Sequence, residues 1–298
     1  MARPTLEFIF WDVRHGAACY IHTPNGRHMV VDLGIGSYGN NKPFSPLLHL
    51  KNTWGVKQLD YVVITHPHRD HMDDIFNFDE LTPKTLRHPG YLSKEEIVAG
   101  NKGDDSDIVE EYMRIHNRFT EDISPGSAFD GTASEHWGGV QMSFFATPAC
   151  NRKYLNNHSI VSIFKYADSK IIIPGDNEPE SWKMLIEKGR FLDAAKNCDI
   201  LLAPHHGRKS GYCPELFEAI GKPYLTVISD GPYCETSATG NYGAQSRGWL
   251  VHYPDDSSER RLCVTTRKDG VIHVRAYYGG DGKPKLIVRA QKGSAGAQ

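Results

Sequence analysis

The fold of this 298-residue chain is decided by the segment Val62-Val63-Ile64-Thr65-His66-Pro67-His68-Arg69-Asp70-His71. A β-branched apolar run, typical of a buried strand, ends there in four potential metal ligands. Side chains alternate between the two faces of an extended chain, so His66 and His68 point the same way. Asp70 and His71 follow where a helix is expected to begin, and they direct further donors toward the same pocket.

These donors favour a metal site. Imidazole and carboxylate groups suit zinc, iron or manganese, and a mixed nitrogen and oxygen set is compatible with two divalent ions. The alternative is a surface cluster of histidines without a metal. It is less favourable because Pro67 and Arg69 leave the donors no apolar core to fill, and unpaired buried imidazoles are costly.

The string T-H-x-H-x-D-H, from Thr65 to His71, resembles the signature of the metallo-β-lactamase fold. The resemblance implies an α/β protein with a four-layer αββα sandwich. It assigns His66 and His68 to one metal, and Asp70 and His71 to a second. Two divalent metal ions, Zn or Mn, are therefore the expected cofactors.

A second apolar strand ends near another acid. Ile171-Ile172-Ile173 leads through Pro174-Gly175 to Asp176, which the resemblance assigns to the position that bridges the two metals. The alternative is that Asp176 only caps the helix expected over Glu180–Lys188.

A third apolar strand, Cys198–Ala203, is followed by Pro204-His205-His206-Gly207. By its position in the family, His205 is the last ligand of the second metal. His206 lies on the opposite face if the chain stays extended, and we expect it to contact the substrate.

One position of the family pattern is vacant. Relatives carry a histidine ligand after a Thr-Pro-Gly, whereas this chain has Thr147-Pro148-Ala149-Cys150. Cys150 and His158 are the two candidates for the third ligand of the first metal. We favour His158, because a neutral imidazole is a routine ligand and a thiolate needs its pKa lowered by the metal.

Several other residues are expected around the metals. The resemblance places Asp32, at the end of the strand His28–Asp32, behind the metal-binding histidines, although an aspartate that only begins a turn is the alternative. Arg208 and Lys209 add positive charge directly after the histidine pair, where a phosphate would be held. His15 is a further candidate for substrate binding.

Most of the chain also resembles the hydrolase domain of the ComEC-type DNA-uptake competence proteins. The similar segments are Asp12–Gly16 for D-V-G-Q-G, Asn156–Ser159 for N-x-x-S, Gly175-Asp176 for G-D, His205–Gly207 for H-H-G, and Thr265–Val274 for a final hairpin. This chain departs from the competence pattern at Arg14-His15, which replaces Gly-Gln, and at Ala17, which replaces an acid. We expect the hairpin over Arg260–Thr266 and Val271–Tyr277, with Leu286–Ala290 as an edge strand.

Composition bounds the class of protein. Hydrophobic residues make up 39% of the chain and charged residues 23%, which is typical of a globular protein with one sizeable core. We expect a single domain over 1–298, with an insertion at about 90–130 and a disordered tail at about 292–298. The formal net charge of -2 provides no global attraction to nucleic acid, so a nucleic-acid substrate requires a local basic surface.

The sequence also suggests a location. Its six cysteines form no C-x-x-C pair, which suits a reducing compartment. The N-terminus has no signal-peptide core, and no apolar run reaches membrane-spanning length. We expect a cytoplasmic protein without a membrane partner, and the sequence identifies no protein partner.

Together these features predict a binuclear metal-dependent hydrolase, a phosphodiesterase or nuclease that acts on a nucleic acid or a nucleotide. Asp70, Asp176 and His206 are expected nearest the reaction. Hydrolysis of a lactone, β-lactam or thioester is the alternative, because activated water attacks carbonyl carbon equally well. A metal-binding sensor without catalysis is a third interpretation.

Overall fold

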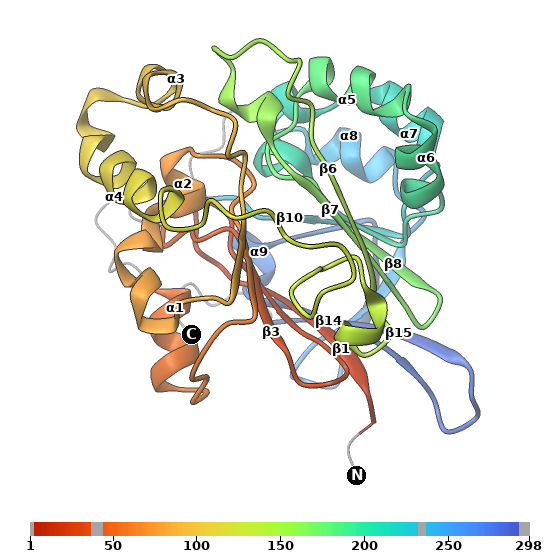
Figure 1. Cartoon of the computed structure of the whole chain (residues 1–298). Helices are drawn as coiled ribbons and strands as arrows, with labels where there is room; N and C mark the ends of the chain where they lie inside the picture. The colour runs from red at the N-terminus through yellow and green to blue at the C-terminus, as the bar shows by residue number, and fades with distance from the viewer. Residues whose placement is uncertain (1–2, 37–43, 232–236, 292–298) are drawn as a thin grey trace.

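Two β-sheets pack face to face, and helices cover the outer side of each, in the computed structural model of the chain (Figure 1). It describes residues 3–36, 44–231 and 237–291. The predicted α/β class and four-layer αββα sandwich are confirmed. The tail predicted at about 292–298 lies outside the described residues.

The first sheet has nine strands within the described residues. Their spatial order is β12 (Ser258–Arg261), β11 (Trp249–His252), β15 (Pro284–Ala290), β14 (Ile272–Tyr278), β1 (Thr5–Phe10), β2 (Cys19–His22), β3 (His28–Val31), β4 (Tyr61–Val63) and β5 (Thr85–Arg87). The hairpin of β2 and β3 forms around Asn25-Gly26, a dipeptide that favours tight hairpin turns. Strands β3, β4 and β5 run parallel, so their carboxyl ends meet at one edge.

The second sheet has six strands in the described part of the chain. Their order is β13 (Cys263–Thr265), β10 (Leu225–Ile228), β9 (Ile200–Leu202), β8 (Ser169–Ile173), β7 (Val161–Tyr166) and β6 (Gln141–Phe145). Strands β8, β9, β10 and β13 are parallel. Residues that follow β8, β9 and β10 therefore gather at one edge, and this arrangement positions the site described below.

Apolar side chains from both sheets fill the space between them. The rings of Phe8 on β1 and Phe164 on β7, for example, meet in a T-shaped arrangement with centroids 5.3 Å apart. Each outer face has its own apolar cluster beneath helices. The nine-stranded sheet is covered by α1 (Pro46–Asn52), α2 (Arg69–Met72), η1 (Asp73–Leu81), α3 (Lys94–Gly100) and α4 (Ser106–His116).

The helices on the six-stranded sheet gather on the other side of the molecule (Figure 1). They are α5 (Pro179–Ile186), α6 (Gly189–Ala195), α7 (Pro214–Ile220) and α8 (Thr239–Ala244). The remaining segments are short: η2 (Gly103–Asp105), η3 (Ser134–Trp137), η4 (Leu155–His158), η5 (Pro204–Gly207), η6 (Lys209–Gly211) and α9 (Thr266–Asp269). Among the described residues, no helix combines the length and the apolar character that crossing a bilayer requires.

The predicted hairpin over Arg260–Thr266 and Val271–Tyr277 is wrong. Strand β13 pairs in parallel with β10, whereas β14 pairs with β1 and β15 in the other sheet. Helix α9 joins them, and the Asp269 carboxylate accepts a hydrogen bond from the Thr265 backbone N–H at 2.8 Å. The predicted edge strand is also wrong, because β15 lies between β14 and β11.

Candidate metal centre

Four buried or half-buried side chains bring one ligand atom each within 4.8 Å of the others: Asp70, His71, Asp176 and His206. His71 Nε2 lies 3.1 Å from Asp176 Oδ1. His206 Nε2 lies 3.0 Å from Asp70 Oδ2 and 3.4 Å from Asp176 Oδ2. We call these residues the donor cluster; its members follow β4 of one sheet and β8 and β9 of the other.

A glycine directs Asp176 into the donor cluster. Gly175 has a positive φ of 62°, and a Cβ there would lie 2.8 Å from atoms of both Thr65 and Ser159. Glycine therefore satisfies the backbone conformation and the close packing together. The Ser159 hydroxyl accepts a 2.9 Å hydrogen bond from the Asp176 N–H, which fixes the turn.

The structure brings His206, and not His205, into the donor cluster. Both residues have positive φ values, 49° for His205 and 53° for His206, so the chain is not extended here and simple alternation between faces does not apply. His205 Nδ1 instead lies 3.1 Å from Glu178 Oε1. It also shares a hydrogen bond with Ser210 Oγ at 2.8 Å. Its Nε2 is 3.9 Å from Asp176 Oδ2.

The Nδ1 atoms of His71 and His206, which face away from the cluster, each contact a hydrogen-bond acceptor. His71 Nδ1 lies 2.8 Å from Asp32 Oδ2, and Asp32 also accepts hydrogen bonds from the Thr65 N–H and hydroxyl. His206 Nδ1 donates to the Ser229 carbonyl at 3.0 Å. These contacts orient each ring with Nε2 toward the cluster.

Ser229 was missed in the sequence analysis. The available signal was its position directly after the apolar strand β10, where a neighbour of the other strand ends is expected.

The cluster is strongly coupled electrostatically. Burial acts to lower the pKa of His71, but the Asp176, Asp32 and Asp70 carboxylates outweigh it and hold the pKa well above its usual value. Burial is likewise outweighed at His206, whose pKa rises to about 10 beside Asp176 and Asp70. Burial acts to raise the pKa of both Asp70 and Asp176, but the neighbouring imidazoles bring each well below its usual value.

His66 and His68 lie next to the donor cluster. His66 Nε2 is 3.0 Å from His68 Nδ1, and the rings of His66 and His71 have centroids 4.2 Å apart. Burial, followed by the charge of His71, holds the pKa of His66 well below its usual value. A neutral imidazole is the form that binds a metal.

The two candidates for a third ligand beside these histidines have other neighbours. His158 Nδ1 is 3.2 Å from the Tyr91 hydroxyl, and its Nε2 is 3.4 Å from the Asn151 carbonyl oxygen. Cys150 Sγ lies 3.5 Å from Met184 Sδ. The structure thus brings neither His158 nor Cys150 into hydrogen-bond contact with the first pair of histidines within the described residues, and the assignment of His158 to the first metal stays a prediction.

Two of the three predicted substrate-binding residues line the same site. His15 Nε2 is 3.3 Å from Asp70 Oδ2, and Arg208 Nη2 is 3.4 Å from both ring nitrogens of His15. Burial and the neighbouring charge of His206 lower the pKa of His15 to about 4. Lys209 is exposed, and no contact ties it to the cluster in the described part of the chain.

The donor set fits a divalent cation. Two carboxylates and two imidazoles with their Nε2 atoms inward are ligands that zinc, iron and manganese accept. The adjacent pair of histidines supplies two further nitrogen donors. The side chains present therefore suit one divalent ion at the donor cluster and provide part of a second site beside it.

Comparison with known families gives one match. Residues 12–231 match the family model for the Metallo-beta-lactamase superfamily. Among curated proteins the comparison found no match.

Several solved structures resemble the chain. CmlA, a diiron β-hydroxylase from Streptomyces venezuelae, is 12% identical over 74% of this chain and 44% of its own, with a TM-score of 0.42. Tm1679, a metal-dependent hydrolase of the β-lactamase superfamily, is 12% identical over 77% of this chain and 90% of its own, at 0.40. AbOPH, a hydrolase in the β-lactamase superfamily, is 18% identical over 54% and 55%, at 0.31. The chain spans less than half the length of CmlA.

Proposed function

The chain belongs to the metallo-β-lactamase superfamily, and we propose that it is a metal-dependent hydrolase of phosphodiesters, a phosphodiesterase or nuclease. The observation that carries the choice of substrate is the guanidinium of Arg208 beside the donor cluster. It contacts the ring of His15 at 3.4 Å, and no carboxylate of the described residues pairs with it. A buried Nε of Arg208 also lacks a hydrogen-bond partner there. A guanidinium that has no carboxylate partner among the described residues suits a phosphate at a hydrolytic site, because it can bind two phosphate oxygens at once.

The proposed metal ligands are Asp70, His71, Asp176 and His206 for one ion, with His66 and His68 contributing to a second. Bound zinc or manganese would lower the pKa of water and neutralise charge on the phosphoryl oxygens. We retain Asp176 as the residue shared between the two ions, and His158 as a further ligand of the ion that His66 and His68 bind.

The other residues prepare the site for an anion. Asp32 and the Ser229 carbonyl hold the rings of His71 and His206 in the orientation that presents Nε2. His15, kept neutral by its lowered pKa, lies between Asp70 and Arg208. The guanidinium charge is therefore available to neutralise a phosphodiester in the transition state.

The motif resemblance to the hydrolase domain of the ComEC-type competence proteins supports a nucleic-acid or nucleotide substrate. The similar segments are those around Asp12, Asn156, Asp176 and His205. Because the net charge is -2, such a substrate would depend on local cations such as Arg208 and Lys209.

The test compares turnover of bis(p-nitrophenyl) phosphate, plasmid, single-stranded DNA, RNA and cyclic nucleotides with that of nitrocefin and a lactone, each with Mn²⁺ or Zn²⁺. We expect metal-dependent cleavage of at least one phosphodiester. Asp176→Asn should reduce kcat/KM by about 100-fold or more, and Arg208→Ala by about 10- to 100-fold, which corresponds to roughly 1.4 to 2.7 kcal/mol. Arg190→Ala, an exposed arginine on α6, is the matched control and should retain activity.

Three results would count against the proposal. Turnover confined to nitrocefin or the lactone would assign the site to carbonyl hydrolysis. Metal binding without turnover of either class would favour a sensor. Equal phosphodiester activity in the Arg208 and Arg190 variants would remove the observation on which the choice of phosphate rests.

A further inference from the structure

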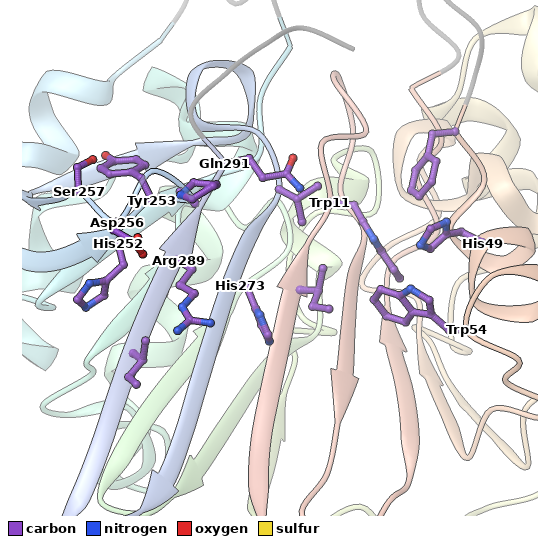
Figure 2. Close-up of a pocket in the computed structure, with 16 residues that line it drawn as sticks. Trp11, His49, Trp54, His252, Tyr253, Asp256, Ser257, His273, Arg289 and Gln291 are labelled. Carbon is purple, nitrogen blue, oxygen red and sulfur yellow. The ribbon is translucent and has the colours of Figure 1, made fainter. Parts of the chain in front are cut away.

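A pocket lies on the outer side of the nine-stranded sheet (Figure 2). It has a volume of about 670 Å³, and β1, β14, β15 and β11 contribute side chains to it. Small-molecule sites in proteins span roughly 300 to 1,000 Å³, so the pocket has the size of a ligand site. None of the donor-cluster residues lines it.

Cationic and imidazole side chains form a row across one part of this pocket. The strand register places Ile9 opposite His273, His273 opposite Arg289, and Arg289 opposite His252. Opposite residues point to the same face of a sheet, so the three polar side chains lie side by side. We call His252, His273 and Arg289 the basic row.

Within the described residues, few hydrogen-bond or carboxylate partners satisfy the side chains of the basic row. Arg289 is exposed and makes no hydrogen bond or ion pair within the described residues. His273 Nε2 is buried without a hydrogen-bond partner, and its nearest carboxylate oxygen, Glu7 Oε1, is 3.8 Å away. Asp256 is the carboxylate that lines the pocket, and it forms no ion pair with Arg289 in the described structure. An anion would supply the missing partner.

Aromatic rings line the other end of the pocket. Figure 2 shows Trp54, Trp11 and His49 on the side away from Arg289, with His273 between the two ends. The ring centroids of Trp11 and Trp54 are 6.1 Å apart, and those of His49 and Trp54 are 5.2 Å apart. Trp54 is 42% exposed, so it presents an open face on which a flat ring can stack.

We propose that this pocket binds a planar aromatic ring joined by a spacer to an anionic group, the chemistry of a nucleoside monophosphate. The ring stacks on Trp54 beside Trp11, and the anion binds Arg289 and His273. A spacer is required because Trp54 and Arg289 lie at opposite ends of the pocket, with His273 between them. Asp256 offers an acceptor for a sugar hydroxyl or an amino group. This site is independent of the proposed phosphodiester hydrolysis.

The test is calorimetric titration of the full chain with AMP in the presence of EDTA, which removes any contribution from metal ions. We expect saturable binding that Arg289→Ala and Trp54→Ala each weaken by about tenfold or more. Arg289→Lys keeps the charge and should weaken binding less than Arg289→Ala. Arg190→Ala and Arg208→Ala should bind AMP like the unmodified chain, because neither residue lines the pocket.

Two further ligands separate the halves of the proposed site. Adenosine lacks the anion and inorganic phosphate lacks the ring, so each should bind at least about tenfold more weakly than AMP. Indole-3-acetate tests whether an aromatic carboxylate with a short spacer substitutes for the nucleotide, and weaker binding than AMP is expected. Thermal unfolding of Trp54→Ala confirms that the variant folds.

The proposal is overturned if AMP gives no saturable binding, if adenosine binds as tightly as AMP, or if folded Arg289 and Trp54 variants keep full affinity. Loss of AMP binding in Arg208→Ala, with Arg289→Ala unaffected, would place the nucleotide at the donor cluster instead. Phosphodiester turnover is measured separately with added metal, so either idea can fail without the other.

Discussion

At the scale of single residues, His88 is an imidazole without a hydrogen-bond partner in the part of the chain that the structure describes. Both of its ring nitrogens are buried and have no hydrogen-bond partner within the described residues. Its ring lies 4.9 Å from that of His116 and 5.8 Å from that of Tyr112. Burial and the neighbouring His116 lower the pKa of His88 to about 4, so the folded protein keeps this ring neutral at neutral pH.

The lowered pKa of His88 predicts that part of the free energy of unfolding is lost at acid pH. The pKa of His88 is lower in the folded state than in the unfolded state, where it is about 6.5, so the unfolded chain takes up the proton first as the pH falls. Stability that is present above pH 6.5 is lost as the pH approaches 4. His88→Gln should reduce that loss by about 2 kcal/mol, measured by chemical denaturation at a series of pH values.

The matched control for this measurement is His136→Gln, which removes an imidazole from η3 instead. Its pH dependence should follow that of the unmodified chain. If His88→Gln loses stability toward acid pH as steeply as the unmodified chain, His88 is not the source of that loss.

At the scale of elements, the turn after β8 contributes both to the stability of the fold and to the position of the proposed metal ligand Asp176. Gly175→Ala would place a methyl group 2.8 Å from atoms of Thr65 and Ser159 in a left-handed conformation. We expect the free energy of unfolding to fall by roughly 3 kcal/mol and metal affinity to drop, because Asp176 follows directly. Denaturation and metal titration measure the two effects.

Gly26→Ala separates backbone strain from the steric clash. Gly26 has a φ of 83° in the β2–β3 hairpin, but nothing lies within 4 Å of an added Cβ. The expected loss is about 1 kcal/mol, with metal affinity unchanged. Losses of equal size at the two glycines would show that packing against Thr65 and Ser159 is unimportant.

Local sequence signals predicted the elements whose geometry is itself local. Helix α1 follows a residue typical of a helix start, and it begins where the Ser45 hydroxyl accepts a hydrogen bond from the Leu48 N–H. The β2–β3 hairpin contains Asn25-Gly26, a dipeptide typical of tight turns. Membership in a sheet is not local: Asp269-Gly270 has the composition of a hairpin turn, yet it ends α9 between two sheets.

The same distinction applies to the candidate site. Asp70, His71 and Asp176 each follow an apolar strand, and the resemblance to the metallo-β-lactamase fold was what brought them together in the prediction; the structure does bring them together. The choice between His205 and His206 was not predictable from alternation, because two consecutive non-glycine residues adopt left-handed conformations there.

At the scale of the whole molecule, the donor cluster joins the two halves of the sandwich. His71 follows a strand of the nine-stranded sheet, whereas Asp176 and His206 follow strands of the six-stranded sheet. These residues are far apart in sequence, so only the folded chain brings them together. A cation held by all three would therefore bind the folded chain and not the unfolded one. Metal binding is therefore expected to stabilise the packing of one sheet against the other.

The last prediction follows from this coupling. Relative to the protein in EDTA, zinc or manganese at 100 times its dissociation constant should stabilise the fold by about 2.7 kcal/mol and raise Tm accordingly. Asp176→Asn should lose most of this increment, because it removes a charged donor that faces both cluster imidazoles. Asp193→Asn, an exposed acid on α6, is the control and should keep the full shift. If neither metal changes the Tm of the unmodified chain, or if the Tm shift is equally large in the two variants, no cation joins the sheets at this edge.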